Sequence, residues 1–363
     1  KRMSIIKEEL LEVQEKYGEE RRTEIIEDFT SLSIEDMIAE EEMVLTITHN
    51  GYIKRTSLST YRSQRRGGRG VQGASSREED FVEHLFVANT HSYILFFTDK
   101  GKCYWVKVYD IPEGGRAAKG RAIVNLIGCE PDEKVSAFIS VKEFHEDHFV
   151  VMATEKGIVK KTKLSAYSNP RKKGIYAVEI RDGDKLIEAR VSTGDNDILL
   201  GTRNGKSIRF SEEQIRASGR KTMGVKGITL SSDDDRLVGM LLIKREGTVL
   251  VATEKGFGKR TEISQYRAQK RGGKGVLTMK TTEKVGKMVT IKEVVEKDDL
   301  MIITNQGVLI RLPVAQIRSI GRATQGVKLI KLGEGTLVSS ITRIMSEEEQ
   351  DEDNNSEPSS DKE

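Results

Sequence analysis

The chain has few of the features that mark secreted, membrane and metal-binding proteins. Its 363 residues include two cysteines, Cys103 and Cys129, which are too few for a disulfide framework or a zinc site. Both are expected to be small packing residues. No apolar run approaches the length of a membrane span, and no signal peptide is recognisable. These absences predict a cytosolic protein, and the polar start Lys1-Arg2-Met3 suggests a fragment of a longer one.

Recognisable catalytic and metal-binding arrangements are missing as well. The histidines have no metal-ligand spacing, and no nucleophile stands beside a general base. The single tryptophan, Trp105, is expected to pack rather than to stack on a base. The sequence therefore predicts neither a metal site nor a catalytic residue in this chain.

The distribution of charge is more informative than the formal net charge of +3. Residues 1–42 carry 6 basic and 14 acidic side chains, and residues 346–363 carry 1 basic and 9 acidic ones, so each segment has a net charge of −8. The remaining body holds 53 basic and 34 acidic residues, a net charge of +19. A body this basic implies a partner with an acidic surface.

One unit occurs six times along this body. Each copy begins with a short apolar strand that ends in threonine, two polar residues and a glycine, which is the signature of a β-hairpin turn. A cation follows four residues after the glycine in five copies, with Trp105 in the other, and a large anchor residue follows after ten, such as Ile111 or Tyr167. The turn glycines are Gly51, Gly101, Gly157, Gly205, Gly256 and Gly307.

The second half of each copy is a basic loop that ends in a closing glycine. The closing glycine lies 19 residues after the turn glycine in every copy except the third, where the gap is 17. Apolar strands are expected next, such as 225–230, and a further strand such as 236–241 ends the unit. The closing glycines are Gly70, Gly120, Gly174, Gly224, Gly275 and Gly326.

These repeats predict an all-β fold with about four strands per copy. The repeat length is in the range of propeller blades. Period-two alternation dominates, and no helical stripe of useful length occurs between Met43 and Met345. We expect one closed or nearly closed ring of six blades over residues 43–345.

The two ends differ from the body. Apolar residues at helical spacing, from Ile5 to Tyr17, precede Gly18 at a C-cap position. Residues 1–29 are expected to be a helical segment and 30–42 a linker. Residues 346–363 have no apolar side chain to bury and are expected to form a disordered acidic tail.

The first basic loop is the most distinctive segment of the chain. Gln64-Arg65-Arg66-Gly67-Gly68-Arg69-Gly70 places three guanidinium groups among three glycines. Arginine binds phosphate oxygens in a forked geometry, and glycine lets a backbone approach a ligand closely. This heptapeptide resembles the gyrase A-box, the signature of the A subunit of bacterial DNA gyrase, and the six repeats extend the resemblance from Ile5 to about Met345.

The resemblance implies a six-bladed β-pinwheel in which neighbouring blades exchange strands and whose basic rim wraps duplex DNA. It implies that the full enzyme, an ATP-dependent type IIA topoisomerase, introduces negative supercoils. The helix would be the end of a coiled-coil arm. The partners would be DNA, the rest of the A-subunit dimer and the B subunit in an A2B2 heterotetramer, in the bacterial cytoplasm at the nucleoid. The catalytic tyrosine and the use of ATP and magnesium would lie elsewhere, so this fragment needs no cofactor.

The candidate DNA-binding residues are those of the basic loops, because one such loop recurs per blade at a fixed offset and equivalent positions in a ring share one circumference. The fifth loop matches the first at five of seven positions and is expected to be a second, weaker anchor. The candidates are Gln64, Arg65, Arg66, Gly67, Gly68, Arg69, Gly70, Arg116, Lys119, Arg121, Arg171, Lys172, Lys173, Arg220, Lys221, Lys270, Arg271, Lys274 and Arg322.

Three alternatives remain open at this point. The corresponding domain of topoisomerase IV resembles this region but has a degenerate or missing box. A propeller that binds an acidic protein would carry the same positive charge. A propeller enzyme with a central metal is the third alternative, and it lacks candidate ligands on the inner strands.

Overall fold

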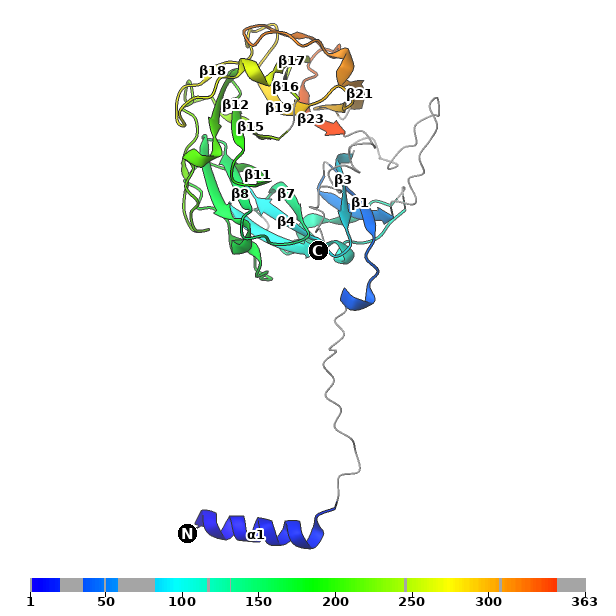
Figure 1. Cartoon of the computed structure of the whole chain (residues 1–363). Coiled ribbons are helices and arrows are strands. Elements are labelled where there is room, and N and C mark those ends of the chain that lie inside the picture. The colour runs from blue at the N-terminus through cyan, green and yellow to red at the C-terminus, as the bar shows by residue number, and fades with distance from the viewer. Residues whose placement is uncertain are drawn as a thin grey trace, which may run out of the picture. The chain divides into compact units, whose positions relative to one another are not determined.

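The repeats form β-sheets in the computed structural model of the chain (Figure 1). The structure describes residues 2–19, 35–48, 50–57, 82–115, 118–130, 132–244, 247–306 and 309–344, with the backbone alone at 82–85, 309 and 344. The chain divides into two compact units, Lys1–Ala39 and Glu40–Glu363. The candidates Gln64–Gly70 and Arg116, and the expected tail, lie outside the described residues.

The first unit contains a helix at the position that the apolar spacing predicted. Helix α1 spans Arg2–Tyr17, and a 3-10 turn, η1, spans Glu35–Met37. The N–H of Gly18 donates to the Gln14 carbonyl at 2.8 Å, which closes the last turn of α1. Residues 20–29 of the expected helical segment lie outside the described residues.

The turn glycines connect the two central strands of the sheets. At Gly101 the N–H donates to the Thr98 carbonyl at 2.9 Å and φ is +78°, in the region that glycine adopts without strain. The Thr98 hydroxyl accepts the N–H of Lys102 at 3.2 Å, so threonine and glycine together complete the turn. The same hydroxyl bond recurs at Thr48, Thr154 and Thr202.

The first three sheets have four strands each. The first consists, from one edge to the other, of β3 (Val82–Asn89), β1 (Glu42–Thr48), β2 (Tyr52–Ser57) and β6 (Arg121–Ala122). The second consists of β7 (Val135–Val141), β4 (Tyr93–Thr98), β5 (Lys102–Lys107) and β10 (Ile175–Tyr176). The third consists of β11 (Leu186–Ser192), β8 (Phe149–Thr154), β9 (Ile158–Lys163) and β14 (Val225–Lys226).

The last three sheets follow the same plan. The fourth consists of β15 (Leu237–Ile243), β12 (Asp197–Thr202), β13 (Lys206–Ser211) and β18 (Val276–Leu277). The fifth consists of β19 (Met288–Val294), β16 (Thr248–Thr253), β17 (Phe257–Glu262) and β22 (Val327–Lys328). In the sixth, the described strands are β23 (Val338–Ile344), β20 (Asp299–Thr304) and β21 (Leu309–Pro313).

The short edge strand of each of the first five sheets comes from the next repeat. Strand β6 follows the second basic loop, yet it pairs with β2 of the first sheet, Tyr52 opposite Ala122. The same offset places β10, β14, β18 and β22 on the preceding sheets. The expected pinwheel with exchanged strands is therefore confirmed.

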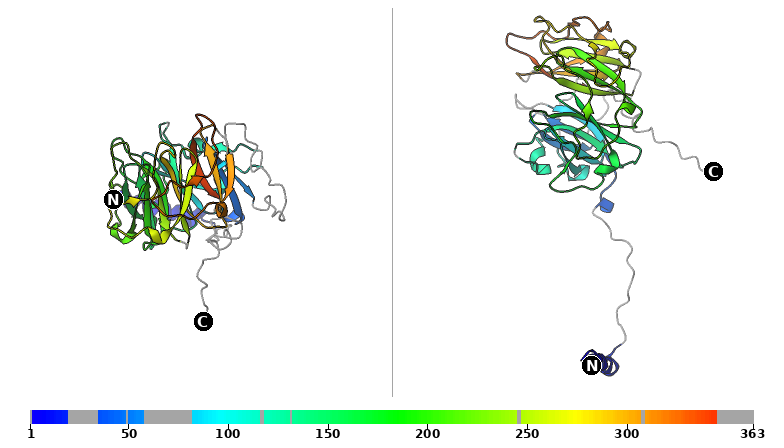
Figure 2. Two further views of the ribbon diagram at one scale, coloured as in Figure 1. Left: turned by 90° about the horizontal axis from the view of Figure 1, so that it is seen from above. Right: turned by 90° about the vertical axis from the view of Figure 1, so that its left-hand side faces the viewer.

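The long strands β3, β7, β11, β15, β19 and β23 lie toward the middle of the ring, with the sheets in chain order around them (Figures 1 and 2). Strand β23 contacts β3, so the last sheet meets the first. Five hydrophobic clusters each join residues of two consecutive sheets. The core is therefore a series of interfaces between blades.

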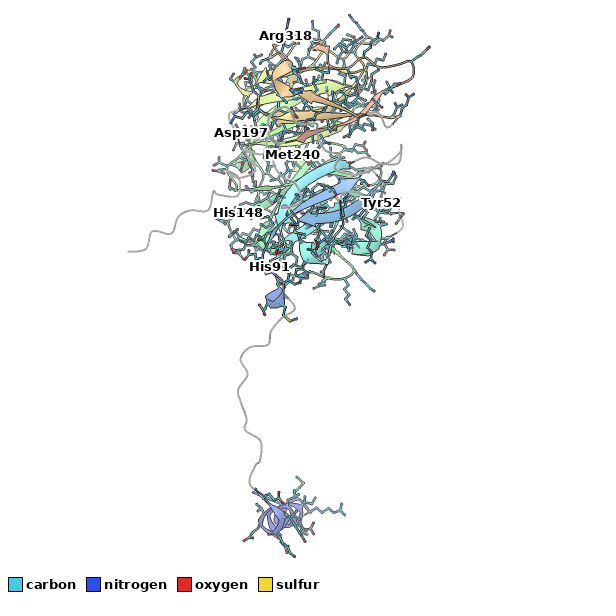
Figure 3. All side chains as sticks on the ribbon, turned by 90° about the vertical axis from the view of Figure 1, so that its right-hand side faces the viewer. Tyr52, His91, His148, Asp197, Met240 and Arg318 are labelled. Carbon is cyan, nitrogen blue, oxygen red and sulfur yellow. The ribbon has the colours of Figure 1, made fainter. Side chains whose placement is uncertain are left out.

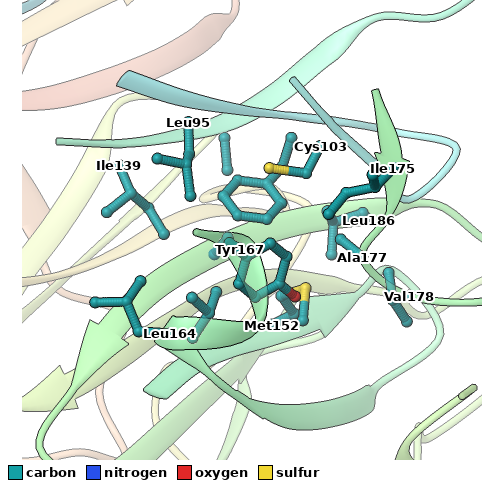
Figure 4. Close-up of a cluster of buried hydrophobic side chains, with 14 of the residues drawn as sticks. Leu95, Cys103, Ile139, Met152, Leu164, Tyr167, Ile175, Ala177, Val178 and Leu186 are labelled. Carbon is teal, nitrogen blue, oxygen red and sulfur yellow. The ribbon is translucent and has the colours of Figure 1, made fainter. Parts of the chain in front are cut away.

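The anchor residues lie in these interfaces, as predicted. Tyr167 is fully buried between the second and third sheets, beside Leu95, Met152 and Leu164 (Figure 4). Its ring meets that of Phe97 edge-on, with the centroids 5.9 Å apart. The equivalent anchors Ile111, Ile215, Tyr266 and Ile317 are at most 3% exposed.

Two local elements differ from expectation. A one-turn helix, α2 (Ile123–Ile127), follows β6, buries Ile123 and Ile127 and ends at Gly128, where φ is +61°. It is too short to produce a periodic pattern. The strand expected over 225–230 is limited to β14, because the N–H groups of Gly227 and Ile228 both turn to the Gly157 carbonyl.

Candidate nucleic-acid interface

Each described basic loop lies along the outer edge of the sheet that precedes its own repeat. In the second loop, Arg55 of β2 donates its N–H to the Pro112 carbonyl and accepts that of Gly114, at 3.1 and 3.0 Å. In the sixth, the Arg260 carbonyl accepts the Ile320 N–H at 2.9 Å. The loop then leaves the edge of this sheet, and the exchanged strand that follows the closing glycine pairs with the same edge again. The cations of one repeat are therefore carried by the blade before it.

The closing glycines make this exchange possible. A Cβ atom on Gly120 would lie 2.4 Å from the Ile53 carbonyl oxygen, and one on Gly275 would lie 2.4 Å from that of Ser207. The close approach of a ligand was predicted for the glycines of the first loop, which lies outside the described residues. At the described closing positions the close neighbour is the preceding sheet. The φ values are +82° at Gly120, +67° at Gly174, +84° at Gly224, +68° at Gly275 and +74° at Gly326.

In the first, second, fourth and fifth sheets, the residue four positions after the turn glycine fixes the chain just before the loop. Arg55 Nε donates to the Ile111 carbonyl and Arg260 Nε to the Ile317 carbonyl, both at 2.7 Å. Trp105 fills the same role, because its indole Nε1 donates to the Tyr167 carbonyl at 2.8 Å. In each case the acceptor is the anchor residue of the next repeat. In the third sheet, Lys161 instead donates to the Gly194 carbonyl at 3.1 Å and pairs with Glu212 at 3.0 Å. These side chains are therefore structural, and the packing role predicted for Trp105 is confirmed.

Backbone hydrogen bonds also join successive basic loops to one another. The N–H of Thr229, just after the fourth loop, donates to the Gly273 carbonyl in the fifth at 2.9 Å. Equivalent bonds join Glu179 to Thr222 at 3.1 Å and Lys280 to Thr324 at 2.9 Å. The third to sixth loops thus form one continuous belt around the outside of the sheets, which we call the basic belt.

Most of the predicted cations in the described part of the chain are exposed, either on the second loop or on the basic belt. Lys119 lies 4.0 Å from the centroid of the Tyr52 ring, a cation–π contact that holds its ammonium at the edge of the first sheet (Figure 3). The exposed candidates are Lys119, Arg121, Arg171, Lys172, Lys173, Lys221, Lys270 and Lys274. Exposure leaves these charges available to a polyanion.

Three candidates, Arg220, Arg271 and Arg322, are half-buried, and two of them have structural contacts. Arg271 donates to the Gln214 carbonyl at 3.2 Å and to the Lys226 carbonyl at 2.6 Å. Arg322 donates to the Leu277 carbonyl at 3.1 Å. Lys226 and Leu277 belong to the exchanged strands of the preceding loops, so these arginines tie neighbouring loops together with part of their guanidinium groups.

One recurring exposed arginine was missed in the sequence. Arg216, Arg267 and Arg318 each follow the anchor residue directly, eleven positions after the turn glycine (Arg318 is labelled in Figure 3). The regular offset was a sufficient signal. These side chains extend the positive surface beyond the loops.

A second set of missed residues lies beneath the belt. Lys54, Lys160 and Lys259 occupy the third position after the turn glycine, where other repeats have Tyr104 and Ile208, and all three are buried. Burial lowers the pKa of Lys54. Burial first, and then the nearby Arg220 and Arg322 guanidinium groups respectively, lowers the pKa of Lys160 and of Lys259 to about 8. A lysine in a row otherwise made of aromatic and branched apolar residues was the signal.

The centre of the ring holds a cavity of about 590 Å³, but its lining does not indicate a metal or an enzyme site. Its charged lining residues are of both signs, and Arg190 pairs with Glu188 at 3.4 Å. Among the described residues, no group of three or more His, Cys, Asp or Glu side chains is placed to hold a metal ion.

The family model for the DNA gyrase C-terminal domain, beta-propeller, matches six segments, and each segment corresponds to one sheet of the ring. They are residues 42–89, 92–142, 148–193, 196–244, 247–294 and 298–344. The chain belongs to the DNA gyrase C-terminal domain family. Together with the exchanged strands, this confirms the six-bladed pinwheel that the box and the repeats predicted.

Curated relatives of this gyrase domain support the same assignment. The chain is 46% identical over 351 residues to the DNA gyrase A subunit of Staphylococcus epidermidis and 46% identical over 361 residues to that of Staphylococcus aureus (strain MRSA252). These alignments cover 96% and 98% of this chain but 39% and 40% of the relatives. The chain therefore spans about two fifths of the length of the curated relatives that it matches.

Solved structures show the same fold. The C-terminal domain of DNA topoisomerase IV superposes with a TM-score of 0.74 at 25% identity, over 87% of this chain and 97% of that one. The DNA gyrase A C-terminal domain superposes with a TM-score of 0.68 at 23% identity, over 84% and 100%. The sequence relatives, not the superpositions, favour gyrase over topoisomerase IV. Among the described residues, no helix is both long and apolar enough to cross a membrane.

Proposed function

We propose that this gyrase domain binds duplex DNA along the basic belt and wraps it around the outside of the ring. The observation that carries the proposal is the continuity of the belt, in which backbone bonds join successive loops with exposed cations. Side chains at equivalent positions of consecutive blades follow a curved path. Cations along such a path contact the phosphate backbone without reading bases.

The electrostatics of the body support a wrap rather than a local contact. Bending a 20–30 base-pair site by 40–90° costs about 1–6 kcal/mol by elastic estimates. Many distributed phosphate contacts are needed to offset that cost, and the body has a net charge of +19 to supply them. The wrap would present a DNA segment to the rest of the enzyme in a fixed sense.

In the complete protein this domain would serve an ATP-dependent type IIA topoisomerase that introduces negative supercoils. Its partners would be the rest of the A-subunit dimer and the B subunit, in an A2B2 assembly in the bacterial cytoplasm. DNA cleavage by the catalytic tyrosine, and the use of ATP and magnesium, would take place in those other parts. The isolated domain is expected to bind and wrap DNA without cleaving it.

The direct test is a topology assay with the isolated domain. Relaxed circular DNA is incubated with the domain, treated with a type I topoisomerase and deproteinised, and the linking number is measured on a gel. A shift in linking number of one sign that grows with domain concentration supports wrapping. No shift despite DNA binding contradicts it.

The salt dependence of DNA affinity tests the alternative of an acidic protein partner. A domain that binds an acidic protein would have a DNA affinity with little dependence on salt, whereas phosphate contacts give a steep dependence.

The first basic loop lies outside the described residues, and its role is tested in the full enzyme. Replacing Arg65, Arg66 and Arg69 with alanine should abolish supercoiling while ATP-independent relaxation survives. A matched control replaces Lys142, Lys163 and Lys185, three exposed cations outside the basic loops. Full supercoiling by the Arg65, Arg66 and Arg69 variant would contradict the assignment of the A-box.

A further inference from the structure

The buried lysines contact the basic loops from below, in alternate sheets. Lys160 is 1% exposed and Lys259 is not exposed at all, so neither ammonium group reaches a ligand on the surface. Lys259 Nζ donates to the Gly321 carbonyl at 2.6 Å, and also to that of Arg322. Lys160 Nζ donates to the Arg220 carbonyl of the next repeat and, at 2.7 Å, to that of Ala177 in its own repeat.

These contacts fix the orientation of the peptide groups in the fourth and sixth loops. Every described peptide bond is trans, and in a trans peptide the N–H points away from the C=O of the same group. A carbonyl of Arg220 that faces Lys160 therefore directs the N–H of Lys221 away from the core. The carbonyls of Gly321 and Arg322 do the same for the N–H groups of Arg322 and Ala323.

We propose that Lys160 and Lys259 are positioning residues that turn these carbonyls inward and thereby present the backbone N–H groups of Lys221, Arg322 and Ala323 as binding sites for phosphodiester oxygens. This inference rests on the proposed DNA-binding function and deepens it. Outward N–H groups in a turn form a concave anion site, and hydrogen bonds to an anionic oxygen are stronger than neutral ones. Within the described part of the chain, none of the three N–H groups donates to a protein acceptor.

The fifth loop provides the contrast. The fifth loop lies on the fourth sheet, which has Ile208 at the position where the third and fifth sheets have a buried lysine. There the N–H of Arg271 donates to Gln214 Oε1 and that of Gly272 to the Gly227 carbonyl, both at 2.8 Å. These N–H groups are occupied by the protein, so the fifth loop can contact DNA through its side chains but not through these amides. The fourth and sixth loops, each with a buried lysine beneath it, thus lie on either side of a fifth loop whose amides are bonded within the protein.

The test uses the chain with both lysines changed to methionine, Lys160→Met and Lys259→Met, which keeps an unbranched side chain as far as Cε and removes the ammonium groups. The matched control is Ile208→Met, the equivalent position beneath the fifth loop. Duplex DNA affinity is measured at several salt concentrations, and folding is checked by thermal unfolding. We expect affinity to fall about tenfold for each loop, which corresponds to about 1.4 kcal/mol. The control should bind like the parent.

The salt dependence separates this role from a direct contact. A lysine that itself neutralises a phosphate flattens the slope of log affinity against log salt by about 0.9 when it is removed. Loss of backbone N–H donors leaves the number of neutralised phosphates unchanged, so the double variant should be parallel to the parent at lower affinity. A flattened slope, or unchanged affinity, would overturn the proposal. A parent that itself shows no salt-dependent binding would refute the DNA-binding function instead.

If the double variant fails to fold, a second measurement tests the same proposal. Replacing Ala323 with lactic acid converts its amide to an ester, which removes one N–H and changes no charge. We expect weaker DNA binding with an unchanged salt slope. Parental affinity in that protein would contradict the proposal. In the parent, DNA affinity should also fall from about pH 7 to pH 9, because the two lysines lose their protons in this range. The charged groups that face Lys160 are Arg220 and Glu179, and the one that faces Lys259 is Arg322.

Discussion

The fifth and sixth basic loops are neighbours on the belt and have the same position in their repeats, yet different groups of the protein bind their carbonyls. The fifth loop is fixed from outside, because Thr229 donates through its backbone to Gly273 and through its hydroxyl to the Gly272 carbonyl at 2.7 Å. The sixth accepts the equivalent backbone bond, from the N–H of Lys280 to the Thr324 carbonyl, and its Gly321 and Arg322 carbonyls are bound in addition by the buried ammonium group of Lys259. The fifth loop thus has a second bond from a threonine hydroxyl where the sixth has a buried charge. The two loops should therefore respond differently to the same kind of change.

The largest expected effect separates the glycines within the fifth loop. Gly275→Ala should destabilise the domain by at least about 1–2 kcal/mol, because φ is +68° and the new Cβ would lie 2.4 Å from the Ser207 carbonyl oxygen. Gly273→Ala should be tolerated, since its Cβ would meet nothing closer than 3.4 Å. Denaturant unfolding of both variants checks this. Equal stability of the two would contradict the role given to the closing glycine.

The next effect concerns the charges of the two loops. Changing Lys270, Arg271 and Lys274 to alanine should reduce DNA affinity and wrapping partially, and flatten the salt slope by up to about 0.9 for each lost phosphate contact. Arg322→Ala, the single candidate cation of the sixth loop, should flatten it by no more than about 0.9. Binding titrations at several salt concentrations make the comparison. A triple variant that wraps DNA like the parent would show that the fifth loop repeats the first in sequence only.

A smaller effect separates stability from binding as pH rises. The pKa of Lys160 and of Lys259 is about 8 in the folded protein, against an ordinary 10.5. Below pH 8 both states hold the protons. Between pH 8 and 10.5 the unfolded state holds more of them, so rising pH favours the folded state in this window. The free energy of unfolding of the parent should therefore rise relative to the Lys160→Met, Lys259→Met variant, while DNA affinity falls. A parallel pH dependence in both proteins would contradict these pKa values.

The smallest effect concerns the acidic tail. Truncation after Met345 removes a segment of net charge −8, which we expect to compete with DNA for a body of net charge +19. DNA affinity should tighten most near 0.01 M salt, where the screening length is about 30 Å, and little at higher salt. A tail of equal length with its acidic residues changed to glutamine or asparagine controls for bulk. Equal affinity of all three forms at low salt would exclude competition.

The local features of the fold could be predicted because they depend on short stretches of sequence. The turn at Gly101 and the anchor at Tyr167 follow from a threonine, a glycine and a fixed offset. The sheet to which an exchanged strand such as β6 belongs cannot be obtained from periodicity, since pairing with its own or with the preceding blade gives the same pattern. That assignment came from the family resemblance.

The sequence predicted which loops carry exposed cations but not how roles are divided among their side chains. The offset of the basic loops identified exposed cations such as Lys221 and Lys270 correctly as surface charges. The partial structural role of Arg271 was not predictable, because its acceptors are backbone carbonyls contributed by another repeat. Lys259 stands between Gly258 and Arg260, so nothing in its immediate sequence distinguishes it from an exposed strand residue. Its burial depends on the loop that covers it, which is 62 residues away at Gly321.

The exchange of strands between repeats also determines how the ring bears force. A basic loop is anchored at its start by paired backbone bonds to the preceding sheet and at its end by a strand such as β22, which pairs with β17. Tension from DNA stretched between two loops would pull such a strand along its own axis. The hydrogen bonds of that strand would then be loaded together, in shear. In a loop attached to a single blade, the bonds would break one after another. The exchanged strands that connect neighbouring blades are therefore the parts of the ring that would carry this tension.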